Sequence, residues 1–235
     1  MAFQTTQWTL VVAAGDSQHP DSRAALAELC QGYWYPLYVY LRRRGYSQEE
    51  AEDLVQGFFA QLLEKNYIKA ADKERGRFRS FLLASLKNYA ANEWDRRTAV
   101  KRGGTTATLS LDFEDAEGRY VIEPADERTP EQEFDRGWAM AQLHRVLERM
   151  RSEAGPGEAT ERFELLQGFL TGEGEDMPYK EVAERLGMSE GAVKVAVHRL
   201  RQRFGAVLRD EVARTLADPD DVDDEIRHLF AAFER

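Results

Sequence analysis

The sequence predicts an all-α protein with two helical domains joined by a linker and followed by an acidic C-terminal helix. Three observations lead to this prediction. Apolar residues recur at spacings of three and four along much of the chain, often just after helix-capping residues. Residues 103–128 interrupt this pattern with a Gly-Gly pair, threonines and many acids. Basic and acidic blocks also alternate along the chain.

The first predicted domain, residues 1–102, contains helices over about 21–44, 47–66 and 78–97. The first helix ends at a glycine, and Pro36 inside it is a position for a kink. The second begins at the capping box Ser-Gln-Glu-Glu. The third contains neither glycine nor proline, so nothing in its sequence interrupts it.

Residues 103–128 are the predicted linker. Its alternation of apolar and polar residues leaves a short hairpin between 109–113 and 119–122 as an alternative to an extended segment. The second predicted domain, residues 129–208, begins with a threonine followed by a proline at the first helical position. Helices are expected to about Arg151 and over 158–170.

Residues 178–204 read PYKEVAERLGMSEGAVKVAVHRLRQRF and predict a helix-turn-helix. Gly187 supplies the positive φ of the turn, and Ser189 caps the second helix. The small Ala183 permits close packing, and Val193 points back into the core. The exposed face of the second helix then carries a basic set: Lys194, His198, Arg199, Arg201 and Arg203. This face fits DNA, and a solvated basic helix in a bundle is the alternative.

Residues 209–235 form an acidic extension. Asp218 and Pro219 are expected to start a helix with acids in its first turn. Apolar residues at helical spacing would give it a face that needs a partner: Ile226, Leu229, Phe230 and Phe233. We hypothesise that this helix docks on the protein and tunes its activity, with a simple extension of the second domain's core as the alternative.

The whole chain of 235 residues has 32 basic and 42 acidic residues and a net charge of −10, which by itself argues against a nucleic-acid partner. The distribution of basic and acidic residues along the chain reverses that inference. Residues 51–110 carry 11 basic against 7 acidic residues, and 177–208 carry 6 against 3. The excess acid lies in 111–176 and in the extension, so both candidate DNA-contacting blocks are locally basic.

Residues 75–102 interleave basic residues with aromatic residues. Cations neutralise phosphates and aromatic faces stack on unpaired bases, so this composition suits a protein that holds melted strands. The alternative is that Phe78, Phe81 and Tyr89 belong to a core stripe. We expect most of these aromatic residues to be core, and Trp94 and the arginines of this segment to be exposed.

The sequence gives no support for an enzyme, a metal-binding protein or a membrane protein. The histidines at positions 19, 144, 198 and 228 are far apart, and there is no nucleophile-elbow or phosphate-loop motif. We therefore expect no catalytic residue, metal or cofactor. The single cysteine allows no internal disulfide, and no apolar run is long enough to span a membrane. A cytoplasmic location is expected.

Two segments carry a family resemblance. AEDLVQGFFAQLLEK (51–65) followed by FRSFLLASLKNYAANEWDRR (78–97) resembles region 2 of the sigma-70 family, and PYKEVAERLGMSEGAVKVAVHRLR (178–201) resembles its region 4. Their order and the linker between them resemble the small extracytoplasmic-function (ECF) class. The resemblance implies an alternative sigma factor that binds core RNA polymerase, through its β′ coiled coil and β flap, and directs promoter-specific transcription initiation. An anti-sigma factor or another regulator would be a further partner.

The resemblance also implies site residues. Core-polymerase binding would fall to polar residues of the helix after the capping box: Glu52, Asp53 and Gln56. The −10 element would be melted and read by region 2 through Arg75, Arg77, Asn88, Glu93, Arg96 and Arg97. The −35 element would be read by region 4 through Ser189, Glu190, Lys194, His198, Arg199 and Arg201.

The sequence departs from the family pattern at Val195-Ala196, where many members carry Ser-Arg, and in the acidic extension. Two other function classes stay open at this point. One is a helix-turn-helix regulator that acts without core polymerase, and the other is a helical adaptor that binds only proteins.

Overall fold

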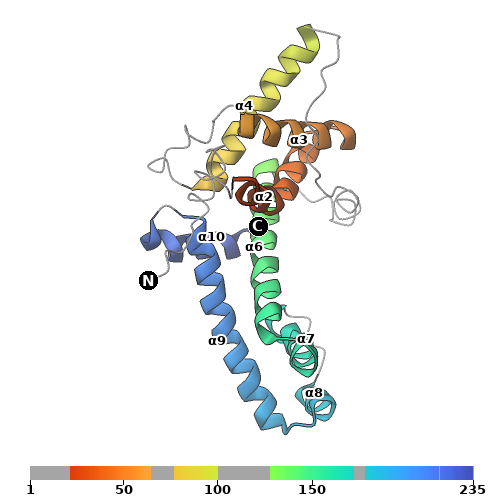
Figure 1. Cartoon of the computed structure of the whole chain (residues 1–235), viewed down its shortest axis with the longest axis vertical. Helices are drawn as coiled ribbons and strands as arrows, with labels where there is room; N and C mark the ends of the chain where they lie inside the picture. The colour runs from red at the N-terminus through yellow and green to blue at the C-terminus, as the bar shows by residue number, and fades with distance from the viewer. Residues whose placement is uncertain (1–21, 65–76, 100–127, 172–177, 217, 235) are drawn as a thin grey trace. The chain divides into compact units, whose positions relative to one another are not determined.

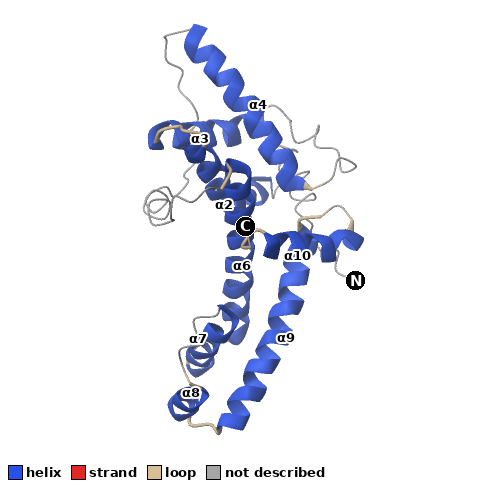
Figure 2. Ribbon diagram, turned by 180° about the vertical axis from the view of Figure 1, so that it is seen from behind, coloured by secondary structure: helices blue, strands red, loops and turns tan. Residues whose placement is uncertain are grey.

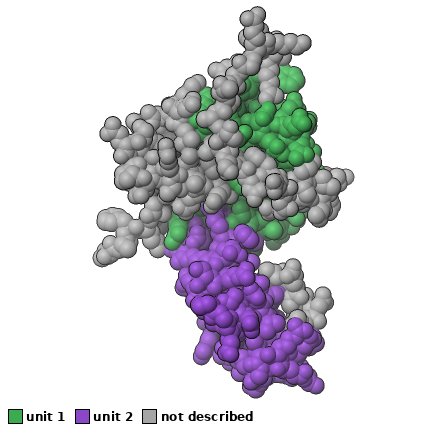
Figure 3. Space-filling model, turned by 45° about the vertical axis from the view of Figure 1, so that its right-hand side comes forward, with its two compact units in different colours: residues 1–141, 212–235 green, residues 142–211 purple. Residues whose placement is uncertain are grey.

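The computed structural model describes residues 22–64, 77–99, 128–171, 178–216 and 218–234. Every regular element in these ranges is a helix, as predicted (Figure 2). The linker, with its hairpin alternative, and Arg75 lie outside the described residues. The chain divides into two compact units, unit 1 comprising residues 1–141 and 212–235 and unit 2 comprising residues 142–211 (Figure 3).

The helices follow the predicted order (Figure 1). The helices α4, α6 and α7 run past their predicted ends, whereas α2 and α3 are slightly shorter than predicted. Their bounds are α2 Ser22–Arg43, α3 Gln48–Glu64, α4 Phe78–Ala99, α6 Pro130–Ala154, α7 Glu158–Thr171, α8 Tyr179–Leu186, α9 Glu190–Arg214 and α10 Val222–Ala231. A short 3₁₀ turn, η4, covers Pro219–Asp221 before α10.

Local capping signals set where these helices start. The Ser47 amide donates to Glu50 Oε2 at 2.9 Å while the Glu50 amide donates to Ser47 Oγ at 3.2 Å, which is the predicted capping box. Thr129 and Gln132 make the same reciprocal pair ahead of α6, at 2.8 and 3.2 Å. These bonds satisfy amides that the first turn leaves without intrahelical partners.

The core of unit 1 is built from aromatic and aliphatic side chains of α2, α3, α4 and the first part of α6. Tyr33 and Phe78 meet edge to face with ring centroids 5.4 Å apart, and Trp138 is fully buried. The helices α2 and α6 approach closely, since a Cβ added at Gly137 would lie 3.3 Å from Pro36 Cα. Pro36 is accommodated within α2, which continues to Arg43.

Charged side chains are also buried in unit 1. Glu133 of α6 is 1% exposed and accepts from Arg43 Nη2 at 3.1 Å, with Arg128 Nη1 at 3.6 Å. A buried carboxylate needs such partners because its desolvation is costly. The ion pair therefore ties the end of α2 to the start of α6.

The C-terminal helix departs from its prediction in two ways. Its apolar face was expected to include Phe230, which is 45% exposed. Leu229 is buried as expected, and Ile226 and Phe233 are half-buried. Leu229 shares its buried stripe, at spacings of three and four, with Val222 and the carboxylate of Glu225. Asp218 caps η4, by accepting from the Asp220 amide at 2.9 Å, and the α-helix starts only after that turn. Residues 212–235 belong to unit 1, so α10 does not extend the core of unit 2.

Candidate nucleic-acid interface

Unit 2 contains the predicted helix-turn-helix. Gly187 closes α8 with φ +60°, and the Met188 amide donates to Ala183 O at 2.9 Å. That left-handed conformation favours glycine because it has no Cβ. Ser189 then caps α9, since its Oγ accepts from the Ala192 amide at 3.2 Å. These local bonds set the angle at which α9 leaves the turn.

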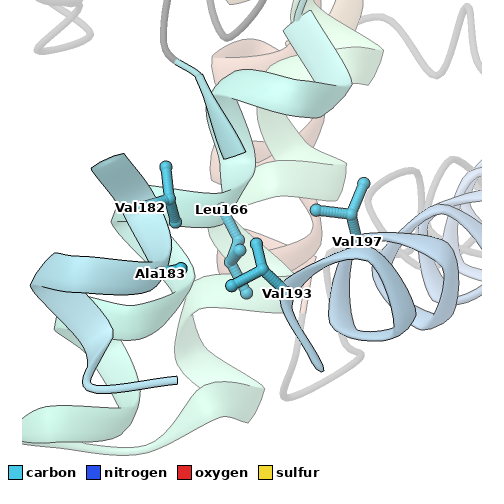
Figure 4. Packing of buried hydrophobic residues seen from close by; sticks show 5 residues of the cluster. All are labelled: Leu166, Val182, Ala183, Val193 and Val197. Carbon is cyan, nitrogen blue, oxygen red and sulfur yellow. The ribbon is translucent and has the colours of Figure 1, made fainter. Parts of the chain in front are cut away.

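A small apolar core holds α8 against α9. Figure 4 shows Val193 beside Leu166 of α7, with Val182, Ala183 and Val197 in the same cluster. All five are at most 5% exposed. Phe169 stacks on Tyr179 at 4.8 Å between ring centroids and extends the contact of α7 with α8. The opposite face of α9 is left for solvent or a partner.

The side chains predicted to read the −35 element lie on that exposed part of α9 or at its cap. Every one of them is exposed: Ser189, Glu190, Lys194, His198, Arg199 and Arg201. Glu190, Lys194, His198 and Arg201 follow one another at spacings of three and four, so they share a face. Lys194 Nζ lies 5.6 Å from the centre of the Tyr179 ring, and Arg201 Nη2 donates to Phe169 O at 3.2 Å.

Arg199 is on a different side of α9 from Arg201. It borders a groove of about 630 Å³ in unit 2, together with Val195, Leu200 and Arg203. Val195 is 51% exposed and lies one helical turn from both His198 and Arg199. Of the two positions at which this chain departs from the family pattern, Val195 is therefore an exposed apolar side chain one turn from two predicted DNA contacts, and Ala196, where many members carry arginine, is half-buried. Sequence reasoning treated this departure only as a lost cation.

Arg203, which sequence reasoning assigned to the basic face, is held inside unit 2. Its Nε donates to Glu153 Oε2 of α6 at 3.0 Å. Arg149 of α6 pairs in turn with Asp210 and, at 2.8 Å, with Glu211. Hydrogen bonds from Arg203 lower the pKa of Glu153, and those to Asp210 and Glu211 raise the pKa of Arg149. These pairs fix α9 against α6, so Arg203 acts within the fold.

In unit 1, α3 presents the residues predicted to bind core polymerase. Glu52 and Gln56 are half-buried and Asp53 is exposed, all on the side away from the buried Ala51, Leu54 and Val55. Glu52 Oε1 accepts from Gln48 Nε2 at 2.9 Å. The three predicted residues lie within one helical turn of each other, so one partner surface can reach all of them.

The residues predicted to read the −10 element are spread along α4. Arg77 directly precedes the helix, Asn88 is exposed at its middle, and Glu93 is half-buried. Arg96 and Arg97 lie in its last turns by backbone, and their side chains are outside the described residues. Arg77 and Asn88 are separated by about 16 Å of helix, at 1.5 Å per residue. The structure thus places the predicted set along one helix without gathering it into one pocket.

Asn88 borders a small pocket between α3 and α4. Its volume is about 90 Å³, and its other lining residues are Phe58, Gln61, Leu62, Ser85, Tyr89 and Asn92. Amide, hydroxyl and aromatic groups of this kind can hydrogen-bond and stack on an unpaired base. Sequence reasoning missed Gln61, Ser85 and Asn92, although the latter two lie one turn on either side of Asn88 and could have been found from that spacing.

Trp94 is 59% exposed, as expected, and lines a different pocket of about 320 Å³ with Lys87, Tyr40 and Glu131. Lys87 Nζ donates to Glu131 Oε1 at 2.7 Å and lies 5.5 Å from the centre of the Tyr40 ring. This hydrogen bond raises the pKa of Lys87 and lowers that of Glu131, while burial raises the pKa of Tyr40. The Lys87 cation is therefore already compensated within unit 1.

Arg79 corrects the expectation that the arginines of this segment are exposed, because it is the most enclosed cation of α4 among the described residues. It is 7% exposed and pairs with Glu225 of α10 and Asp135 of α6. Its guanidinium carbon lies 4.4 Å from the centre of the Trp138 ring. Arg79 thus holds three helices of unit 1 together.

Within the described residues there is no group of His, Cys, Asp and Glu side chains able to hold a metal ion. No helix in those same ranges has the length and apolar character needed to cross a membrane.

The comparisons with known proteins identify two family regions in the chain. The model of Sigma-70 region 2 matches residues 34–100, and that of Sigma-70, region 4, matches residues 173–204. No curated protein and no solved structure matches the chain. The two matched regions occur in the family's order, and the region 4 model is of the ECF type. The chain therefore belongs to the sigma-70 family and is an ECF-type sigma factor, a DNA-binding protein of transcription initiation that serves promoter recognition.

Proposed function

We propose that this sigma factor binds core RNA polymerase through α3, reads the −35 element with α9 and opens and reads the −10 element with α4. The main support for this proposal is the exposed face of α9. The capped turn fixes the start of this helix, and the apolar cluster holds its opposite face against α7 and α8. A helix presented in this way can enter the major groove, where base edges are read directly.

On α9, Lys194, His198 and Arg201 supply the cationic or hydrogen-bonding groups, and Val195 supplies an apolar surface. A lysine can donate to guanine O6 and N7, and an exposed valine can contact the methyl group of thymine.

On region 2, Asp53 and its neighbours on α3 would meet basic side chains of the β′ coiled coil. The pocket beside Asn88 would receive an unpaired base, whose unstacking costs a few kcal/mol and is offset by phosphate contacts. Region 4 would in addition contact the β flap. We further propose that an anti-sigma factor is a partner, that the protein is cytoplasmic and that it has no catalytic role.

Core-dependent transcription tests the proposal as a whole. The purified protein and core enzyme should start transcripts from a promoter recovered by sequencing the DNA that their complex binds. A protein that shifts duplex DNA alone and never supports transcription with core enzyme would instead be a helix-turn-helix regulator. Binding to proteins without any promoter DNA would favour the adaptor.

The core contact has its own test. Asp53→Arg should weaken core binding at least tenfold because it places a cation against the basic partner surface. Asp223→Arg makes the same charge change at an exposed position of α10, outside both proposed contacts with core polymerase, and is the matched control. Equal core affinity for Asp53→Arg and the wild type would overturn the assignment of α3.

A further inference from the structure

The C-terminal helix α10 places a buried carboxylate against the start of α4. Glu225 is 1% exposed and lies in the stripe of α10 that faces the rest of unit 1. Its Oε1 accepts from Arg79 Nε at 2.9 Å, and its Oε2 accepts from Arg77 Nε at 2.7 Å and from Arg79 Nη2 at 3.3 Å. One carboxylate thus takes up two guanidinium groups that follow each other at i and i+2.

The two arginines differ in what else holds them. Arg79 also pairs with Asp135 and lies over Trp138, so it stays in place with or without Glu225. Arg77 is 30% exposed and reaches Glu225 from the solvent side, next to His228. Arg77 is therefore the cation that a ligand from solution can take from Glu225.

Arg77 is also a residue proposed to contact the −10 element. A phosphate oxygen and the Glu225 carboxylate need the same N–H groups of the guanidinium, in the same fork geometry. The outer side of this part of the chain is acidic as well, since Asp221, Asp223 and Asp224 are exposed. Their negative potential opposes the approach of a DNA strand to the start of α4.

The docked state of α10 is suited to release. The helix has 10 residues, which is too short for stability on its own in water. Its apolar anchors are Val222 and Leu229, and Phe230 remains exposed. A pocket of about 50 Å³ lies beside it, lined by Gln132, Asp135, His228 and Ala231 among others. Segments held by few buried contacts are the ones that open locally in folded proteins.

We propose that α10 is an internal competitor of promoter DNA for region 2. In the free protein Glu225 occupies Arg77 and the acidic helix covers the start of α4. When region 2 takes up the opened strand, Arg77 moves from Glu225 to a phosphate and α10 leaves its site. This inference rests on the proposed function of α4 and specifies how that function is restrained before DNA is bound.

The first test measures strand binding by the full chain with a fluorescent, random-sequence single-stranded DNA of about 20 nucleotides, long enough for one binding site. Glu225→Gln keeps the shape of the side chain and removes its charge. We expect it to bind the strand about tenfold more tightly than the wild type, which corresponds to about 1.4 kcal/mol. Arg77→Ala in the Glu225→Gln background should abolish the gain.

Asp224→Asn is the matched control, because Asp224 is the exposed neighbour of Glu225 and pairs with Arg227 of the same helix. It removes an equal charge without touching Arg77, so its affinity should change less than twofold. An equal gain in both variants would show a general charge effect and overturn the proposal. An unchanged affinity of folded Glu225→Gln would overturn it too.

Hydrogen exchange of the wild-type chain gives a second test that needs no variant. Saturating single-stranded DNA should reduce the protection of amides in α10 while leaving those of α7, in unit 2, unchanged. Protection of α10 that stays constant or rises with DNA would mean that the helix remains docked, and would overturn the competition.

Failure of this inference is distinguishable from failure of the proposed function. If the wild type with core enzyme binds no promoter DNA and directs no transcription, the proposed function fails. If the wild type with core enzyme transcribes normally, while Glu225→Gln binds the strand no better than the wild type and α10 stays protected, only the competition fails.

Discussion

Single charged residues determine much of unit 1, and Arg79 is the clearest of them. It contacts side chains of α6 and α10 from its position in the first turn of α4. Removing one member of a buried ion pair leaves the other charge without compensation, which costs more than the pair contributes. Arg79 therefore has a large effect on folding although its sequence context marks it as one of several surface cations.

Arg79→Met should lower the free energy of unfolding by about 3 kcal/mol, because Glu225 stays buried with one guanidinium fewer. Arg227→Met removes the same charge from an exposed pair within α10 and should change stability by about 0.5 kcal/mol or less. Urea unfolding of both variants checks this. Similar losses in the two would contradict the role of Arg79.

His228 makes the docking of α10 depend on pH. Burial and the neighbouring Arg77 and Arg79 lower its pKa, against an opposing effect of Glu225 and Asp135. The undocked helix has a His228 of ordinary pKa, about 6.5, so it binds a proton more readily than the docked one. Docking is therefore favoured above that pH and weakens as pH falls through it.

The corresponding measurement is hydrogen exchange of α10 at pH 7.5 and 5.5, corrected for the intrinsic pH dependence of exchange. Protection should decrease at the lower pH in the wild type and decrease less in His228→Gln. Identical pH dependence in both proteins would exclude His228 as the titrating group.

At the scale of helices, α9 has a core face and an exposed face that is proposed to read DNA, and two valines, two residues apart, mark these faces. Val193 is fully buried beside Leu166, whereas Val195 is 51% exposed. Because successive residues are 100° apart on a helix, a spacing of two separates these side chains by about 200°. The two faces can therefore be changed independently.

Val193→Ala should reduce the stability of unit 2 by about 2 kcal/mol, from lost burial and the cavity left behind. Val195→Ala should leave stability within about 0.5 kcal/mol and instead reduce discrimination in favour of thymine in the −35 element. Thermal unfolding and binding to a set of −35 variants in complex with core enzyme measure the two effects. Loss of stability in Val195→Ala would contradict this division.

The close approach of α2 and α6 offers a further test at this scale. Gly137→Leu should destabilise unit 1 by about 2 kcal/mol, because a side chain there meets the backbone of Pro36. Gly205→Leu, where nothing lies within 4 Å of an added Cβ, should stabilise by up to about 1 kcal/mol, since glycine is a poor helix former. Denaturant unfolding measures both changes. If the two substitutions changed the free energy of unfolding in the same direction, the close packing of α2 against α6 would be contradicted.

The helices could be predicted because their signals are local. Ser47 with Glu50 and Thr129 with Gln132 are three residues apart, and the turn at Gly187 is readable from a single residue. The same holds for the exposed face of α9, whose periodicity lies in the sequence itself. What remained unpredicted depends on partners far along the chain.

The buried acid of α10 shows why. An acidic run ordinarily predicts a solvated face, and nothing in the run distinguishes Glu225 from Asp223 or Asp224. The distinction comes from Arg79, which precedes Glu225 by 146 residues. The pocket at Asn88 was likewise hidden, since Gln61 comes from another helix. Spacing within one segment gives no information on either juxtaposition.

At the scale of the whole molecule, some of the acidic residues behind the net charge of −10 form ion pairs within the protein. Acids of α6 and α10 pair with basic residues of the protein itself, among them Arg77, Lys87 and Arg203. Exposed cations of α9, including Lys194, Arg199 and Arg201, lie where the −35 element is proposed to bind. This arrangement predicts weak binding of the free protein to duplex DNA.

Removal of residues 216–235 should destabilise unit 1 selectively, because Glu225, Val222 and Leu229 are buried in that unit and not in unit 2. We expect the exchange protection of α2–α4 to decrease and that of α7 and α8 to remain unchanged. Phe230→Ser, which alters an exposed position of α10, is the control and should change neither. A uniform loss across both units would contradict this expectation.

The pairing of Arg79 with Glu225 also bears on how the protein is made. Translation adds roughly 5–20 residues per second, so the 146 residues between the two take roughly 7–30 seconds to synthesise. During that interval the nascent chain has produced α2, α3 and α4 but lacks Glu225, one of the two carboxylates that pair with Arg79. Unit 1, whose first helices precede unit 2 along the chain, is therefore completed only after unit 2 has been synthesised.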